Sequence, residues 1–113
     1  MQRKLDLVSL MKIIEHMKSL IELHVLHMDF KKTDNNSREL QKRCFKSPAK
    51  RVHFSPTRNG INCSAKILCI ALSNIFPNLE MLTLQTRGDY LGNRQEILDN
   101  LKMFPKLSYA NIM

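Results

Sequence analysis

The sequence contains no tryptophan, and aromatic residues make up only 6% of it. A core must therefore be built mainly from leucine, isoleucine and methionine side chains. The three glycines lie in separate predicted turns, which excludes a glycine-rich loop for binding phosphate. No apolar run approaches the length of a membrane span, and charges alternate through the N-terminal residues, unlike a signal peptide. With 113 residues, the chain is expected to form a single domain, 1–113.

The sequence also lacks the residue patterns of an active site or a metal site. Its three cysteines, Cys44, Cys63 and Cys69, have no zinc or redox spacing, and reduced thiols indicate a cytoplasmic or nuclear protein. His24 and His27 stand three apart on a predicted strand and would face opposite sides. No Ser/His/Asp or paired-carboxylate arrangement has supporting context. We therefore expect no enzyme, no cofactor and no metal.

Acidic residues are scarce in the middle of the chain, and this produces the net charge of +8. Residues 31–66 contain ten Lys and Arg against two acidic residues, so their net charge is 10 − 2 = +8. The two flanks carry eight charges of each sign and cancel. This distribution predicts a local basic loop. The segment lacks interleaved aromatic residues for base stacking, so nucleic acid is not the expected partner.

An internal repeat organises the rest of the sequence. Four segments share the pattern of an apolar residue, a second one three positions on, and a third two positions later. They are Leu20-x-x-Leu23-x-Val25, Ala49-x-x-Val52-x-Phe54, Leu79-x-x-Leu82-x-Leu84 and Leu107-x-x-Ala110-x-Ile112. Their starts at 20, 49, 79 and 107 are 29, 30 and 28 residues apart. This constant period predicts four equivalent strands.

Helical patterns precede at least three of these strands. Residues 3–18 carry apolar side chains at three-and-four spacing, ending with Met17, and residues 65–75 do the same. Asn93 and Glu96 resemble a capping box before a third helix whose apolar face would run from Ile97 and Leu98 to Phe104. Each unit is therefore predicted to be a helix followed by a strand.

This arrangement resembles a leucine-rich repeat of the ribonuclease-inhibitor or F-box/leucine-rich-repeat type, although no F-box segment is visible. The resemblance implies an α/β fold: a short solenoid of about four helix-strand units, near 1–30, 31–58, 59–86 and 87–113, with a parallel sheet. The unit at 31–58 is the poorest, and it is either a repeat or a disordered basic insertion that interrupts the array. The chain departs from the family at Met28, Thr57 and Arg87, where Asn or Cys is usual.

The resemblance implies a non-catalytic module that binds a protein partner through the concave face of its sheet, such as a substrate-recognition fragment of an F-box-like adaptor. Arg51, Met81 and Tyr109 are the expected anchors. The chain stops inside its last strand, so we expect a second copy, a partner or further repeats at that sheet edge. The residues expected on the concave face are Glu22, His24, Leu26, Arg51, His53, Ser55, Met81, Thr83, Gln85, Tyr109, Asn111 and Met113.

An alternative function arises from the stretch KSPAKRVHFSPT, residues 46–57. Lys50, Arg51, Val52 and Phe54 resemble the RVxF motif with which regulatory subunits dock on type-1 protein phosphatase. That mode of binding requires an extended peptide with both apolar side chains free. Ser47 and Ser55, each followed by proline, would be phosphosites that regulate docking. The two functions exclude each other in one conformation, because the repeat buries Val52 and Phe54.

Overall fold

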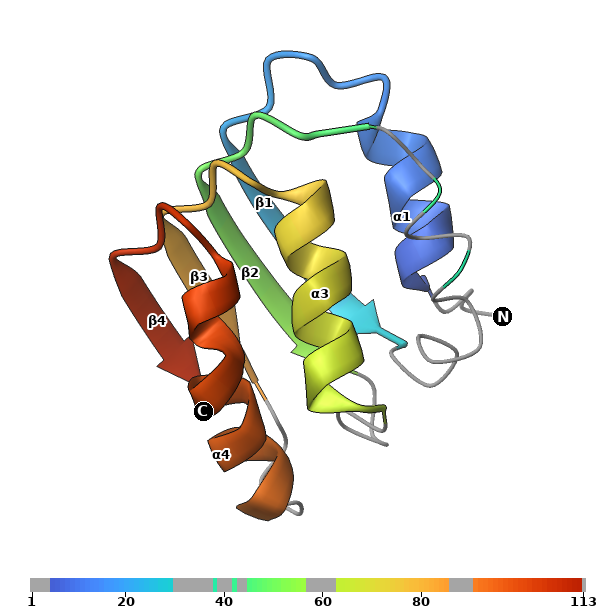
Figure 1. Ribbon diagram of the computed structural model, residues 1–113. Coiled ribbons are helices and arrows are strands. Elements are labelled where there is room, and N and C mark those ends of the chain that lie inside the picture. Colours follow the sequence, from blue (N-terminus) through green and yellow to red (C-terminus); the bar gives the residue numbers. More distant parts are fainter. Residues whose placement is uncertain are drawn as a thin grey trace.

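Helices and strands alternate along the chain in a computed structural model that describes residues 5–29, 45–56, 63–85 and 91–112, with Arg38 and Lys42. The order of elements is α1 (Leu7–Ile14), β1 (Glu22–Met28), β2 (Arg51–Pro56), α3 (Ala65–Ile75), β3 (Met81–Leu84), α4 (Leu91–Asn100), the 3₁₀ helix η1 (Leu101–Met103) and β4 (Tyr109–Ile112). The strands form one layer and the helices a second layer on one side of it (Figure 1).

The strands form one parallel sheet in the order β1-β2-β3-β4. Their register places Leu23 beside Val52, Val52 beside Leu82, and Leu82 beside Ala110. These are the residues that the sequence alignment makes equivalent, so the four predicted strands are confirmed and equivalent residues pair in the sheet. The α/β class with a parallel sheet is confirmed as well.

The core lies between the helical layer and the facing side of the sheet. Successive side chains of a strand point to opposite faces, so one side of each strand faces the helices and is buried or half-buried there. Near the middle of the sheet, Phe54 is fully buried, and its ring centroid lies 6.4 Å from that of Phe76. The strands contribute Val25, Met28, Val52, Phe54, Leu82, Leu84 and Ile112, and the helices contribute Leu7, Leu10, Met11, Ile14, Leu68, Leu72, Ile75 and Ile97.

The first helix is shorter than predicted. Asp6 caps its start, because the Asp6 carboxylate accepts a hydrogen bond from the Ser9 amide at 2.8 Å. Leu5 forms a bridge with Met28 beside β1 and is not helical. The helix ends at Ile14, so Met17 lies in the following turn and is 42% exposed. The predicted helix over residues 3–18 is therefore too long, because the described residues before Leu7 and after Ile14 are not part of it.

The last α-helix also differs from its prediction. It begins at Leu91, so Asn93 lies inside the helix and not at its cap. Leu98, expected on the buried face, is exposed, whereas Ile97 and Phe104 are buried. By contrast, α3 ends at Ile75, two residues before Pro77, as a helix stopped by proline should.

Candidate interaction surface

The face of the sheet that points away from the helices is the candidate interaction surface, and we call it the open face. Its side chains alternate along each strand with the buried ones, as the pleat of a strand requires. Its described members are Glu22, His24, Leu26, Arg51, His53, Met81, Thr83, Tyr109 and Asn111. Gln85 follows β3 and is half-buried, and Met113 lies outside the described residues.

The strand register arranges the open face in two rows that cross the sheet. In the first row Glu22, Arg51, Met81 and Tyr109 are neighbours on β1 to β4. In the second row His24, His53, Thr83 and Asn111 are neighbours in the same order. The structure thus brings together residues that are up to 87 positions apart (109 − 22) in the chain.

A polar cluster occupies the β1–β2 end of the open face. Glu22 Oε1 lies 3.4 Å from Arg51 Nε and 3.4 Å from His24 Nε2. The imidazole of His24 stacks on that of His53, with ring centroids 5.4 Å apart and an interplanar angle of 13°. The hydrogen bond from His24, with a further contribution from Arg51, lowers the pKa of Glu22 from its ordinary 4.5. These contacts hold Glu22 as a carboxylate on the open face.

Replacing His24 with alanine should raise the pKa of Glu22 toward 4.5, because the largest cause of its depression is then absent. Arg51→Gln should raise it by a smaller amount. A carbon-detected NMR titration of the side-chain carboxylates measures both shifts, and His16→Ala, beside Glu15, is the control. The pKa of Glu22 is lower in the folded state than its ordinary 4.5. Any stability that this cluster contributes is therefore present above pH 4.5, and it is lost as the pH falls through the folded-state pKa of Glu22. A Glu22 midpoint unchanged in both variants would contradict the observed contacts.

Large apolar side chains are exposed on the same face. Leu26 is 66% exposed, Tyr109 51% and Met81 39%. Met81 and Tyr109 adjoin Arg51 in the first row, so an arginine, a methionine and a tyrosine are contiguous across three strands. These are residue types that are enriched at protein interfaces. The three side chains predicted as anchors are therefore adjacent.

Ser55 is the one described residue expected on this face that is buried, at 7% exposure. Its hydroxyl lies 3.2 Å from His53 Nε2, which covers it. The register between β1 and β2 shifts after Val25, so the regular rows end there. The prediction that Ser55 contributes to the contact surface is wrong for this reason.

The residues of the docking motif do not form a free peptide. Lys50 and Arg51 are exposed, but Val52 is 3% exposed and Phe54 is fully buried. β2 is hydrogen-bonded to β1 on one side and to β3 on the other, so neither edge of β2 is free to join the sheet of another protein. Docking on a phosphatase would require β2 to leave the middle of its own sheet. Docking through this motif therefore stays a prediction, and it requires β2 to open first.

The expected phosphosites are also inaccessible. Ser47 is fully buried, its amide donates to the Ile75 carbonyl at 2.7 Å, and its hydroxyl accepts from the Ala49 amide at 3.2 Å. With Ser55 buried as well, neither hydroxyl can enter the active site of a kinase while β2 is in place. Phosphorylation at these serines would require local unfolding first.

The thiols and titratable groups of the described residues form no cluster that could hold a metal ion. Across residues 5–29, 45–56, 63–85 and 91–112, no three His, Cys, Asp or Glu side chains gather to hold a metal ion. Cys69 is a free thiol in the core, and its burial raises its pKa to about 11, so it stays protonated and unreactive. Cys63 is half-buried, and Cys44 lies outside the described residues.

No family model matches the chain, and neither a curated protein nor a solved structure does. Among the described helices, none is long and apolar enough to cross a membrane. The open face is the surface whose composition resembles that of a protein interface.

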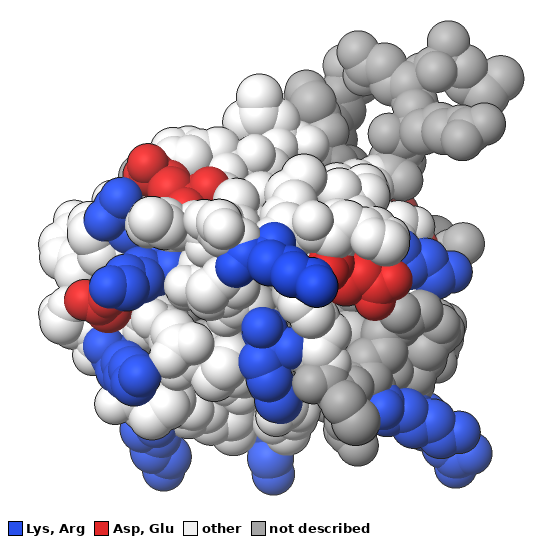
Figure 2. Space-filling model, turned by 90° about the horizontal axis from the view of Figure 1, so that it is seen from above, with Lys and Arg blue, Asp and Glu red and all other residues white. Residues whose placement is uncertain are grey.

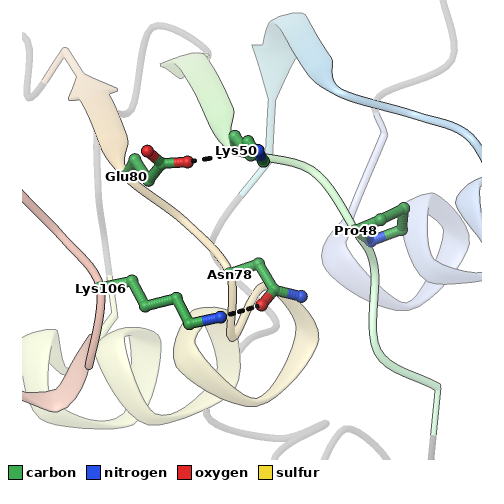
Figure 3. A pocket seen from close by; sticks show the side chains of 5 residues that line it. All are labelled: Pro48, Lys50, Asn78, Glu80 and Lys106. Carbon is green, nitrogen blue, oxygen red and sulfur yellow. Dashed lines mark hydrogen bonds and ion pairs between the residues drawn. The ribbon is translucent and has the colours of Figure 1, made fainter.

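Sequence reasoning missed a second feature, at the end of the sheet where the strands begin. Lys and Arg side chains are spread over this end of the molecule, and acidic ones occupy only small parts of it (Figure 2). A hollow of about 540 Å³ lies here, lined by Pro48, Lys50, Asn78, Glu80 and Lys106 (Figure 3). The repeat alignment could have predicted that these residues lie close together, because each stands directly before or after the first apolar residue of its unit.

Proposed function

We propose that the chain is a non-catalytic interaction module that binds a protein partner through the open face. The observation that carries this proposal is the contiguous row of Arg51, Met81 and Tyr109, exposed on three adjacent strands. The sheet holds the backbone of these residues in place, so little backbone conformational entropy is lost when they bind. Glu22, paired with Arg51, adds a charged group that would help to select the partner.

We further propose that the architecture is a leucine-rich repeat of four helix-strand units, and recurring hydrogen bonds support this. The amide of Lys50 donates to the Ile21 carbonyl at 2.7 Å, that of Glu80 to Lys50 at 2.8 Å, and that of Ser108 to Glu80 at 2.9 Å. Ile21, Lys50, Glu80 and Ser108 hold the same position in their units. The same bonds at the same repeat positions are what stacked equivalent units produce. An adaptor role in ubiquitin ligation stays a prediction from resemblance.

Photo-crosslinking tests the binding surface. A benzophenone amino acid placed at position 109 or 81 should crosslink a protein partner in cell extract, whereas one at position 66 should not. Lys66 is the matched control, because it is exposed but lies on α3, in the layer on the other side of the sheet (Figure 1). Equal crosslinking from all three positions would argue against the open face.

The recovered partner, once purified, allows a quantitative test. Arg51→Glu combined with Tyr109→Ala should weaken its binding by roughly a hundredfold or more, since two hot-spot residues at the centre of an interface are removed. The melting temperature should change little, because both side chains are about half exposed or more. Lys66→Glu should leave the affinity unchanged. If thermal stability fell and binding survived, the assignment of this face would be wrong.

A further inference from the structure

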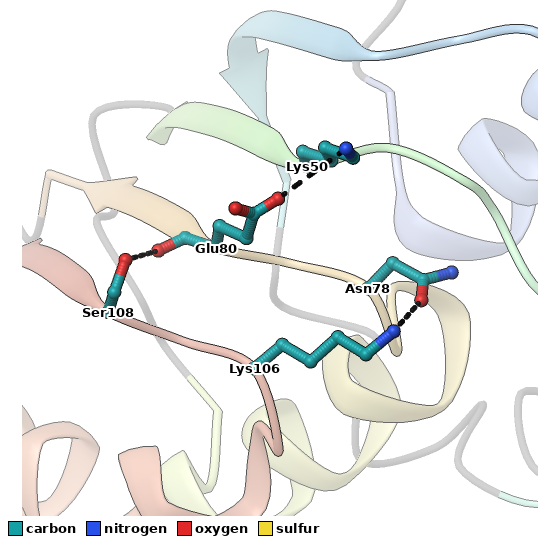
Figure 4. A network of polar contacts seen from close by, with 5 residues as sticks. All are labelled: Lys50, Asn78, Glu80, Lys106 and Ser108. Carbon is teal, nitrogen blue, oxygen red and sulfur yellow. Dashed lines mark hydrogen bonds and ion pairs between the residues drawn. The ribbon is translucent and has the colours of Figure 1, made fainter.

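The hollow at the N-terminal end of the strands, which we call the strand-start hollow, has a backbone base held by hydrogen bonds. Its residues come from the connections before β2, β3 and β4, which the recurring backbone hydrogen bonds tie together. The Ser108 hydroxyl also donates to the Glu80 carbonyl at 3.2 Å (Figure 4). Because each connection is bonded to the next, the side chains that line the hollow project from a rigid base.

Two ammonium groups and one carboxylate face this hollow. Lys106 Nζ donates to Asn78 Oδ1 at 2.8 Å, and Lys50 Nζ lies 3.9 Å from Glu80 Oε2 (Figure 4). The second pair is long, and both of its side chains are about half exposed, so it is weak and readily exchanged. The amide nitrogen of Asn78 points away from Lys106 in Figure 3 and has no hydrogen-bond partner among the described residues. The hollow therefore offers more donors than acceptors.

The surroundings of the hollow are basic as well. The connecting segments 45–50, 76–80 and 101–108 contain Lys46, Lys50, Lys102 and Lys106 against Glu80, a net charge of 4 − 1 = +3. A positive potential at this end of the molecule attracts negatively charged partners over roughly a Debye length, about 8 to 10 Å. The ligand of the hollow is therefore expected to be anionic.

We propose that the strand-start hollow binds a carboxylate side chain from an acidic segment of a protein partner. Lys106 and Asn78 provide ammonium and amide donors to the carboxylate, and Lys50, released from Glu80, provides a third. A phosphate fits this site less well, because the backbone amides of Lys50, Glu80 and Ser108 are occupied by carbonyl groups. They cannot form the cradle of amides typical of phosphate sites. This site is separate from the open face and does not depend on it.

Titration with a peptide of ten glutamates tests the proposal directly. The peptide, added to the ¹⁵N-labelled full chain at low salt, should shift the amide resonances of Lys50, Asn78, Glu80 and Lys106. Lys50→Gln with Lys106→Gln should weaken binding about tenfold, the scale expected for losing two surface ion pairs. Glu80→Gln should strengthen it, because the competing carboxylate is removed. Raising the salt concentration should weaken binding in the unchanged chain.

Two controls place the effect at the hollow. Lys66→Gln removes the same charge from α3 and should leave the affinity unchanged. Tyr109→Ala should also have no effect, which separates this site from the open face. The proposal is overturned if the peptide shifts only resonances elsewhere, or if Lys66→Gln weakens binding as much as the double variant. It is likewise overturned if inorganic phosphate shifts the same amides at a lower concentration than the peptide does.

Discussion

Phe54→Ala should lower the free energy of unfolding by about 3 to 5 kcal/mol, the cost typical of emptying a buried phenylalanine site. Phe54 is fully buried, it lies in a central strand, and its ring contacts that of Phe76. A single domain is typically stable by about 5 to 15 kcal/mol, so this variant should be close to unfolding at body temperature. Urea unfolding followed by circular dichroism measures the change.

Tyr109→Ala is the matched control, because it also truncates an aromatic residue of the sheet. Tyr109 is 51% exposed on the open face, so its loss should cost about 1 kcal/mol or less. Amide hydrogen exchange of the unchanged chain gives independent evidence, since residues 51–55 should be strongly protected within the sheet. Exchange at the unfolded rate, together with a small effect of Phe54→Ala, would mean that β2 does not belong to the core and would restore the docking hypothesis.

Ser47→Asp should destabilise the fold by about 3 to 5 kcal/mol at neutral pH, because it places an unpaired carboxylate in a buried site. Ser47 is fully buried beside Ala49 and the end of α3, where its amide is bonded to Ile75. Burial would raise the pKa of the introduced carboxyl group in the folded state. The folded state then binds a proton more readily, so the destabilisation should shrink as the pH falls.

Ser47→Asn is the control that separates charge from size. Its side chain has nearly the same volume as aspartate but no charge, so it should be less destabilising at neutral pH. The difference between the two variants should also disappear at low pH. Equal stabilities at neutral pH would show that Ser47 is accessible to solvent, and it would then be open to a kinase. Thermal unfolding across a pH series measures this difference.

Much of the sheet could be predicted because it depends on local patterns that recur. The alternation in Leu82-Thr83-Leu84 indicates a strand with one buried side. Its repetition at a nearly constant period then fixes which residues of different strands are neighbours. The repeat alignment makes Val52 equivalent to Leu82 and Thr83 equivalent to Asn111, and the sheet pairs both sets. The repeat alignment and the alternation within each strand were also enough to predict most residues of the open face.

Helix ends were predicted less well, since they depend on individual contacts. Apolar spacing continues through Met17, but α1 ends at Ile14. At the other end, the Leu5–Met28 bridge and the Asp6 cap set its start at Leu7. Leu98 fits the apolar spacing of the predicted helix, but it is exposed to solvent. In both cases the pattern shows where apolar residues are, but only tertiary packing decides which of them are buried.

The sequence by itself determined the strands, their parallel register and the two rows of the open face. Tertiary structure decided between the two interpretations of residues 46–56, because Val52 and Phe54 look the same in a free docking peptide and in a buried strand. β1 and β3 occupy both edges of β2, and the helical layer covers its apolar side chains (Figure 1). Tertiary structure also created the strand-start hollow, since its lysines, Asn78 and Glu80 become neighbours only when the connections stack.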